Sequence, residues 1–278
     1  MSTHDEAIEI TVDDQQIDGT LLTPATMVPG VLLVHGWGGS QEQYLARARQ
    51  IAMLGCICLT FDLRGHARDK LEHEHVTRED NLRDVVAAYD LLARQRLVDD
   101  TAIAVVGSSY GGYLASILTS LRPVRWLGLR APALYRDQDW ALPKRQLDRA
   151  DLAAYRRHLV RPEDNRALRA CAAFEGDVLV AESEHDEVVP HPAVASFLGA
   201  FTKAHSLTHR VIEGADHGLV EQTHQKAYTA LLVRWATEMV LGARQGDEQP
   251  ATEPAGAAGS LPKAELGEEI LEELVPLK

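Results

Sequence analysis

Ser109 lies at the centre of a Gly-x-Ser-x-Gly motif that spans residues 107–111. A serine hydroxyl attacks a carbonyl carbon when a base removes its proton and a carboxylate orients that base. Residues 102–106 are small and aliphatic and predict a buried strand, whereas residues 113–121 predict a helix. The motif is therefore expected to form a sharp strand-to-helix turn in which the glycines occupy space that side chains would fill. The alternative is a glycine-rich connection without a chemical role.

Two later segments supply candidate partners for this serine. Asp186 follows a predicted strand at 177–181, and His217 follows one at 207–212. The loops that leave the carboxyl ends of parallel strands converge on one crevice, so serine, acid and histidine are expected to meet there. Other acidic residues compete for the role of the acid. These competitors are Glu182, Glu184, Glu187 and Asp216. Asp216 is adjacent to the histidine and cannot easily reach its ring; Asp186 is preferred, and Glu184 is second.

An acyl-transfer site also needs hydrogen-bond donors for the developing oxyanion. The glycine-rich segment 35–39, His-Gly-Trp-Gly-Gly, directly follows a predicted strand at 31–34. We expect the backbone N–H groups of Trp37 and Tyr110 to form the oxyanion hole, because glycines let the backbone approach a substrate closely. A plain strand-to-helix turn is the alternative for residues 35–39.

The elements that must position these residues alternate along the chain. A hairpin of strands at 7–12 and 17–22 comes first. The remaining expected strands are 31–34, 56–61, 102–106, 126–129, 177–181 and 207–212, and the expected helices are 40–53, 77–95, 113–121, 192–201 and 221–241. Ser40 and Gln43 suggest a capping box on the first helix. Such alternation predicts a parallel sheet with helices on both faces.

The helix from Thr77 is expected to be amphipathic. Its predicted buried side comprises Val85, Val86, Tyr89, Leu91 and Leu92.

Residues 132–175 interrupt the alternation. They are helix-prone, contain no strand-like run and are too long for an ordinary loop, so we expect a small helical cap over the carboxyl edge of the sheet. Tyr135 and Trp140 are expected to line a substrate pocket together with His35. Lys144 and Arg145 are expected either to offer charge to an anionic leaving group or to face water.

The composition excludes several classes of function. The chain has 278 residues and a formal charge of −13, which argues against a nucleic-acid or membrane partner because either would need a basic face. No apolar run of about 18 residues spans a bilayer, the N-terminus lacks a secretory pattern, and three cysteines suit a reducing compartment. A cytoplasmic location is expected.

Residues 243–278 are rich in Gly, Ala, Pro and Glu and predict a disordered acidic tail in which residues 266–274 contain one apolar stripe.

Between residues 31 and 241 the chain resembles the α/β-hydrolase family. The resemblance rests on five pieces in the family's order, at residues 35–39, 62–66, 107–111, 186–190 and 214–217. Ala67 stands where similar proteins usually carry glycine. The resemblance implies an eight-stranded, mostly parallel sheet and a Ser109–His217–Asp186 triad. Together with the alternation of elements, the helix-prone segment 132–175 and the tail from 243, this predicts an α/β fold with a doubly wound sheet and a small helical cap in one domain at 1–242.

Within the family the chain looks most like small intracellular esterases related to dienelactone hydrolases and prolyl-oligopeptidase catalytic domains. The expected function is hydrolysis of a carboxylic ester or related acyl bond, without a cofactor, by a monomer or homodimer acting on a small acyl substrate. The alternatives are an acyl-peptide or thioester hydrolase with the same triad and a non-catalytic binding module of the same fold. No metal site is expected, because His66, His73 and His75 are better explained as part of a solvated loop.

Overall fold

The computed structural model describes residues 3–12, 15–24, 27–66 and 72–246. Strands β1 (Thr3–Val12) and β2 (Gln15–Pro24) form the expected antiparallel hairpin. Each residue of one strand pairs with a residue of the other along the full length, and the hairpin is a two-stranded sheet of its own. The expected eight-stranded sheet is thus a six-stranded sheet plus this hairpin in the described part of the chain.

The six-stranded sheet is wholly parallel. Its strands are β3 (Val28–Val34), β4 (Ile57–Thr60), β5 (Val98–Ser108), β6 (Trp126–Arg130), β7 (Asp177–His185) and β8 (Ser206–Asp216). Their spatial order is β4-β3-β5-β6-β7-β8. From β3 the chain first adds β4 on one side and then adds β5 to β8 on the other side. The direction of strand addition therefore reverses beside β3. The loops after β3 and β5 diverge at this point and leave a crevice.

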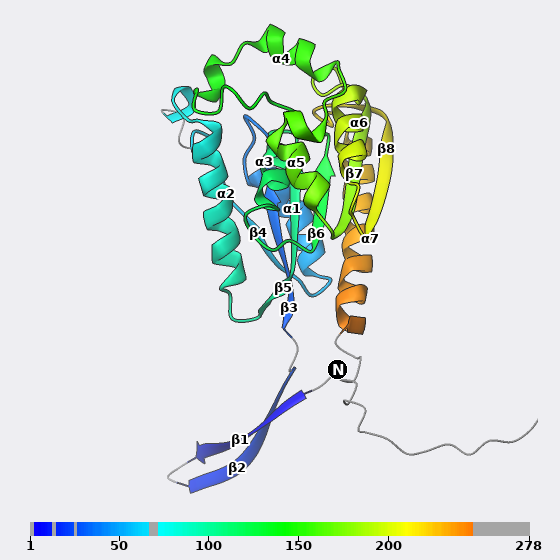
Figure 1. The fold of residues 1–278 in the computed structure, drawn as a ribbon. Coiled ribbons are helices and arrows are strands. Elements are labelled where there is room, and N and C mark those ends of the chain that lie inside the picture. The colour runs from blue at the N-terminus through cyan, green and yellow to red at the C-terminus, as the bar shows by residue number, and fades with distance from the viewer. Residues whose placement is uncertain (1–2, 13–14, 25–26, 67–71, 247–278) are drawn as a thin grey trace, which may run out of the picture. The chain divides into compact units, whose positions relative to one another are not determined.

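Helices cover both faces of this sheet (Figure 1). Helices α1 (Glu42–Ala52) and α7 (Gln222–Gly246) pack on one face, and α2 (Arg78–Ala93), α3 (Tyr110–Leu118) and α6 (His191–Ala200) pack on the other. The two faces use alternate residues of each strand: Val31 and Leu33 point to α1 and α7, whereas Leu32 and Val34 point to α2 and α3. Burial on both sides explains why the strands are continuous apolar runs.

The buried side of α2 is narrower than the sequence suggests. Val85, Tyr89 and Leu92 are buried at spacings of four and three, which is one helical stripe. Leu91 lies off that stripe and is 50% exposed, so its predicted burial is wrong.

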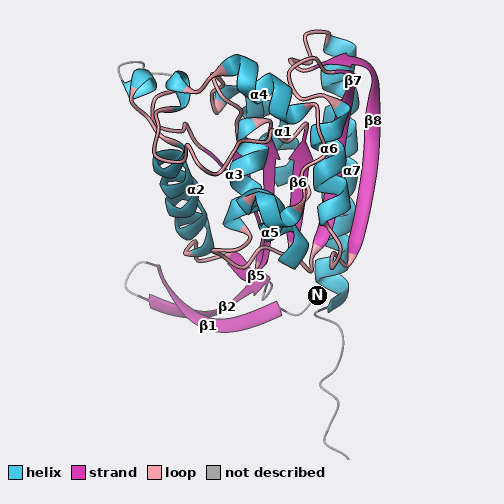
Figure 2. Cartoon of the chain, turned by 45° about the horizontal axis from the view of Figure 1, so that its top comes forward, coloured by secondary structure: helices cyan, strands magenta, loops and turns pink. Residues whose placement is uncertain are grey.

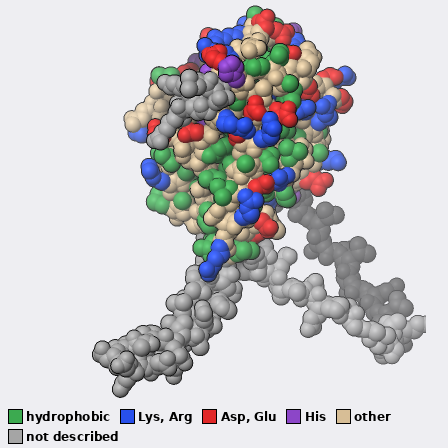
Figure 3. All heavy atoms as spheres, turned by 90° about the vertical axis from the view of Figure 1, so that its left-hand side faces the viewer, with side chains coloured by type: hydrophobic (Ala, Val, Ile, Leu, Met, Phe, Trp, Pro, Cys, Tyr) green, Lys and Arg blue, Asp and Glu red, His purple; other side chains and the backbone are tan. Residues whose placement is uncertain are grey.

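On the side of the molecule that carries α2, basic and acidic side chains lie next to one another (Figure 3), and Arg64 pairs there with Asp84 at 2.6 Å.

The N-terminus of α1 differs from the prediction. No side chain of its own segment caps it, so the proposed Ser40–Gln43 capping box is wrong. Instead the Asp62 carboxylate, which follows β4, accepts from Gln41 N at 2.8 Å and from Gln41 Nε2 at 3.0 Å. A carboxylate from a neighbouring strand end satisfies the helix terminus and complements its dipole, which removes the need for a local cap.

The segment 132–175 contains two α-helices, α4 (Arg149–Arg156) and α5 (Arg166–Ala173), each begun by an Asp or Asn side-chain cap. Helix α4 lies at the edge where the strands end (Figure 2), whereas α5 returns to pack against α3 on the sheet face. Only the first part of the segment is therefore in a position to cover the carboxyl edge.

The closing helix α7 continues to Gly246, four residues beyond the boundary expected at 242. Residues 247–278, including the predicted stripe at 266–274, lie outside the described residues. No helix in the described ranges is long and apolar enough to cross a membrane.

Candidate active site

Ser109 sits at the turn between β5 and α3. Its backbone has φ 51° and ψ −114°, a conformation that L-residues rarely adopt, and its N–H donates to Arg130 O at 2.8 Å. A side chain at Gly107 would lie 2.4 Å from the Gly111 carbonyl oxygen, and one at Gly111 would lie 2.3 Å from the Val34 oxygen. Both glycines are thus required by close backbone approach, as the motif predicts.

Ser109, His217 and Asp186 form a continuous hydrogen-bonded chain. The Ser109 hydroxyl donates to His217 Nε2 at 3.0 Å, and His217 Nδ1 donates to Asp186 Oδ2 at 2.6 Å. The Asp186 side chain is 2% exposed, and its other oxygen accepts from the N–H groups of Val188 and Val189 at 2.9 and 2.7 Å. The carboxylate therefore holds the histidine in the tautomer that leaves Nε2 free to accept the serine proton.

Three of the four competing acidic residues have other partners. Glu184 accepts from Gly214 N at 2.7 Å, and Asp216 accepts from Val220 N at 2.9 Å. Glu182 contacts His191 at 2.8 Å and His209 at 3.0 Å. Asp186 is the acidic residue that contacts the His217 ring.

The segment 35–39 approaches Ser109 closely. A Cβ added at Gly36 would lie 3.4 Å from Ser109 Cβ. The Gly36 carbonyl oxygen accepts from His35 Nδ1 at 2.8 Å and from Gly39 N at 3.0 Å. Because the peptide bond is planar and trans, fixing this oxygen also fixes the opposite direction of the Trp37 N–H. Tyr110 is the first residue of α3, so its N–H has no intrahelical partner and is available to an oxyanion.

His35 is a structural residue, not a wall of the pocket as the sequence suggested. It is 1% exposed, and its Nε2 accepts from Leu63 N at 3.0 Å while Nδ1 donates to Gly36 O. Burial lowers the pKa of its imidazole, which keeps the ring neutral in this arrangement. His35 therefore joins the ends of β3 and β4 and holds the peptide that presents the Trp37 N–H.

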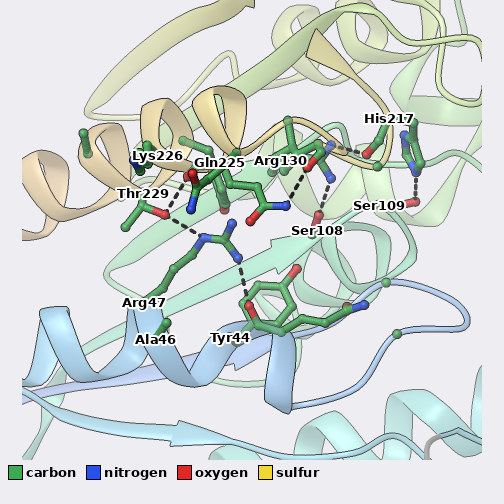
Figure 4. Close-up of a pocket in the computed structure, with 18 of the residues that line it drawn as sticks. Tyr44, Ala46, Arg47, Ser108, Ser109, Arg130, His217, Gln225, Lys226 and Thr229 are labelled. Atoms are coloured by element: carbon green, nitrogen blue, oxygen red, sulfur yellow. Dashed lines mark hydrogen bonds between the residues drawn. The ribbon is translucent and has the colours of Figure 1, made fainter.

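A cavity of about 650 Å³ contains Ser109 and His217 and extends between α1 and α7 (Figure 4). Tyr135 and Trp140 do not line it. Tyr135 is 3% exposed and stacks edge-on against Tyr110 and Tyr113, and Trp140 packs under the Arg166 guanidinium at 4.0 Å. Both aromatic residues anchor the segment 132–175 to α3, because their large apolar rings complete the core on that face.

Lys144 and Arg145 have different environments. The Lys144 ammonium lies 3.9 Å above the Trp37 ring and 5.2 Å from the Tyr135 ring, and burial lowers its pKa. Burial raises the pKa of Tyr135, but the charges of Lys144 and Arg156 outweigh that effect and leave the pKa lowered. Arg145 pairs with Glu74 at 3.0 Å on the surface.

The histidines near residue 66 do not form a metal site in the described structure. His66 contacts Arg64 O through Nδ1, and His73 contacts Gly65 O, while both rings pack against Trp37. Burial lowers the pKa of His66 to about 4. No group of three His, Cys, Asp or Glu residues in the described ranges is placed to hold a metal ion.

Arg130, which was not predicted from the sequence, is a buried residue that contacts several segments of the site. It is 6% exposed and donates from Nη1 to Ser108 Oγ at 3.0 Å and from Nη2 to Ser183 Oγ at 3.3 Å and to the backbone oxygen of His217. The signal in the sequence is a single arginine at the carboxyl end of an otherwise apolar buried strand. A charged group in that position must find partners at the sheet edge.

This sheet order, the serine turn and the segment 35–39 define an α/β-hydrolase fold. Residues 42–242 match the model of the prolyl oligopeptidase family (Peptidase_S9), and the chain belongs to that family. Comparison with curated protein sequences gives no match.

Solved structures similar to this chain include three hydrolases. A dienelactone hydrolase from Anabaena variabilis is 18% identical, with 84% of this chain and 96% of that chain covered and a TM-score of 0.54. A structure described under the metagenome-derived lipolytic enzymes LipS and LipT is 18% identical (77% and 94% covered, TM-score 0.59). A Pyrococcus furiosus esterase is 18% identical (86% and 94% covered, TM-score 0.58). At this identity the likeness concerns the fold.

Proposed function

We propose that this hydrolase cleaves a carboxylic ester or a related acyl bond through an acyl-enzyme on Ser109. The observation that carries the proposal is the hydrogen-bonded chain from Ser109 Oγ through His217 to Asp186, with distances of 3.0 and 2.6 Å. The two contacts give the serine a base and give the base its orienting carboxylate, which is what a serine nucleophile needs.

In the proposed reaction His217 Nε2 takes the Ser109 proton while Oγ bonds to the carbonyl carbon. The carbonyl oxygen becomes an oxyanion that the N–H groups of Trp37 and Tyr110 stabilise. His217 then gives its proton to the leaving group as the bond to that group breaks, which forms the acyl-enzyme. A water molecule repeats the sequence in the second half, so that the acid is released and Ser109 recovers its proton.

Asp186 acts by stabilising the imidazolium that forms in both halves. Its second oxygen accepts hydrogen bonds from two backbone N–H groups, which hold the carboxylate in place. The names of similar structures, which include esterases and lipolytic enzymes, support an ester as the scissile bond.

A second candidate is hydrolysis of an acyl-peptide or thioester with the same residues. The match to the prolyl oligopeptidase family favours the peptide form of this alternative. The two candidates share a nucleophile and differ in the leaving group.

The test is labelling with a fluorophosphonate followed by a substrate panel. We expect Ser109 to be the labelled residue and 4-nitrophenyl acetate and butyrate to be hydrolysed faster than N-acyl-alanine 4-nitroanilide. Labelling with faster anilide cleavage would favour the peptide candidate. Absence of both labelling and turnover would contradict the proposal.

A further inference from the structure

The cavity beside Ser109 has an unusual charge for this chain. The sequence carries 41 acidic and 28 basic residues, so a cavity with an average lining would be acidic. Among the described residues that line it, however, the charged ones are Arg47, Arg130 and Lys226, with no aspartate or glutamate. A cavity with one sign of charge attracts the opposite charge and raises its local concentration.

Arg130 is already engaged with the backbone of His217 and with Ser108, so it is not free to bind a ligand strongly. Arg47 is more available. Its Nε donates to Thr229 Oγ1 at 3.0 Å and its Nη1 to Gln43 O at 2.9 Å, and both acceptors are uncharged. The guanidinium also lies 5.0 Å from the Tyr228 ring, which holds it over the cavity. It forms no ion pair with a carboxylate of the described residues.

Lys226 lies on α7, one turn from Thr229, and is exposed. Figure 4 shows Ser109 and His217 at one end of the cavity and the side chains of Arg47 and Lys226 toward the other. Other side chains that line the cavity are uncharged and can form hydrogen bonds. They include Gln43, Gln222, Gln225 and Tyr44.

From this arrangement we infer that the cavity binds a substrate carboxylate at the Arg47–Lys226 end while the acyl bond lies at Ser109. The inference rests on the proposed function and adds the class of substrate: an ester that carries a carboxylate distant from the scissile bond. A planar guanidinium suits a carboxylate, and a lysine beside it adds a second charge. The uncharged polar side chains of the lining would hydrogen-bond to the part of the substrate that links its carboxylate to the scissile acyl bond.

The experiment compares matched pairs of esters at low ionic strength. The first pair is 4-nitrophenyl hexanoate and the 4-nitrophenyl monoester of adipic acid, which places the carboxylate on the acyl side. The second pair is 4-propylphenyl acetate and the acetate ester of 3-(4-hydroxyphenyl)propionate, which places it on the leaving group. We expect kcat/KM for the anionic member to exceed that of its neutral partner by about tenfold in at least one pair, with the excess shrinking as salt is added.

Two variants and one control assign that preference to the cavity. Arg47→Gln and Lys226→Glu should each reduce the ratio of anionic to neutral kcat/KM by about threefold or more. Lys226 is exposed, so its variant should fold even if Arg47→Gln weakens the contact between α1 and α7. Lys203→Gln, which removes an exposed cation outside the cavity lining, should keep the ratio.

Three outcomes would overturn the inference: no anionic preference in either pair, a preference that salt does not change, or a ratio unaffected by the Lys226 variant. Its failure is distinguishable from failure of the proposed function. Cleavage of the neutral esters with labelling of Ser109 would uphold the hydrolase even where the anionic preference is missing.

Discussion

The guanidinium of Arg130 donates to the backbone oxygen of His217. Its other contacts are to the hydroxyls of Ser108, which precedes Ser109, and Ser183, which lies in β7 before the loop that carries Asp186. One buried side chain at the end of β6 therefore contacts the three chain segments that carry the serine, the acid and the histidine. Through the contact with its backbone oxygen, Arg130 holds the loop that carries His217 in position.

Replacing Arg130 by methionine should lower kcat by about 10- to 100-fold, because small displacements of a base from its nucleophile are costly. KM for a short neutral ester should change little, since the variant disturbs the base and not the binding of the acyl group. The measurement is steady-state kinetics with 4-nitrophenyl acetate. Arg125→Met, at an exposed position before the same strand, is the control. A loss in Tm with unchanged kcat would assign Arg130 to stability alone.

Ser109→Ala should lower turnover by about 10⁶ and abolish fluorophosphonate labelling, because the members of a triad act as a unit. The fold should persist, since the alanine removes only a hydroxyl. Ser120→Ala, at an exposed position in the turn after α3, should behave as the unchanged protein. Turnover within tenfold of the unchanged protein would mean that another residue is the nucleophile.

Asp186→Asn should lower kcat by about 10⁴, because an amide favours the wrong imidazole tautomer and cannot stabilise the imidazolium. Glu184→Gln should have little effect, since Glu184 contacts Gly214 N and not the histidine. The measurement is kcat of both variants and the unchanged protein at the same pH. The reverse ranking would transfer the role of the acid to Glu184.

Stability should fall in mild acid because of His66. The ordinary pKa of 6.5 applies to the unfolded chain, and the folded pKa is about 4. Above pH 6.5 the His66 imidazole is neutral in both the folded and the unfolded state. Between pH 6.5 and 4 the unfolded state binds a proton that the folded state does not, so the free energy of unfolding decreases. The loss approaches ~3 kcal/mol near pH 4. Burial of His35 acts in the same direction.

Urea denaturation at several pH values measures this effect. His66→Phe removes the titration while keeping an aromatic ring against Trp37, and its stability should depend less steeply on pH. His158→Gln, at an exposed position, should keep the original slope. Equal slopes for all three proteins would show that His66 does not contribute.

Trp140→Ala should destabilise the protein by about 2–3 kcal/mol, because the ring packs among Arg78, Tyr113 and Arg166 on the far side from the cavity. The preferred acyl-chain length should stay the same across a series of 4-nitrophenyl esters, with Tm followed in parallel. A change in chain-length preference at unchanged Tm would restore Trp140 as part of a substrate pocket.

The alternation of apolar runs and helical stripes predicted most of the parallel sheet, because burial on both faces leaves a strong local pattern. The cap of the first helix could not be predicted, because its partner lies on a distant segment. The N-terminus of α1 is capped by Asp62, some twenty residues away, so the nearby Ser40 and Gln43 were misleading. The hairpin at residues 3–24 has a clear strand pattern, yet that pattern does not say which sheet a strand joins.

In the candidate site, too, some residues could be predicted from the sequence and others could not. Ser109, His217 and Asp186 could be chosen because each stands at a strand end with the residue type that acyl transfer needs. Tyr135 could not be placed, since an aromatic residue in a capping segment fits a pocket wall and a packing anchor equally well. Arg47 lies on a helix face that reads as ordinary surface, and its position over the cavity depends on the approach of α1 to α7.

The backbone of Ser109 carries a further consequence. Its φ of 51° lies in a backbone region that L-residues rarely occupy, which costs on the order of 1–3 kcal/mol, and glycine would adopt this φ with less strain. The β5–α3 connection therefore gives up stability at the position that places a hydroxyl beside the cavity, and attempts to raise the melting temperature should leave position 109 unchanged and look for gains elsewhere in the sequence.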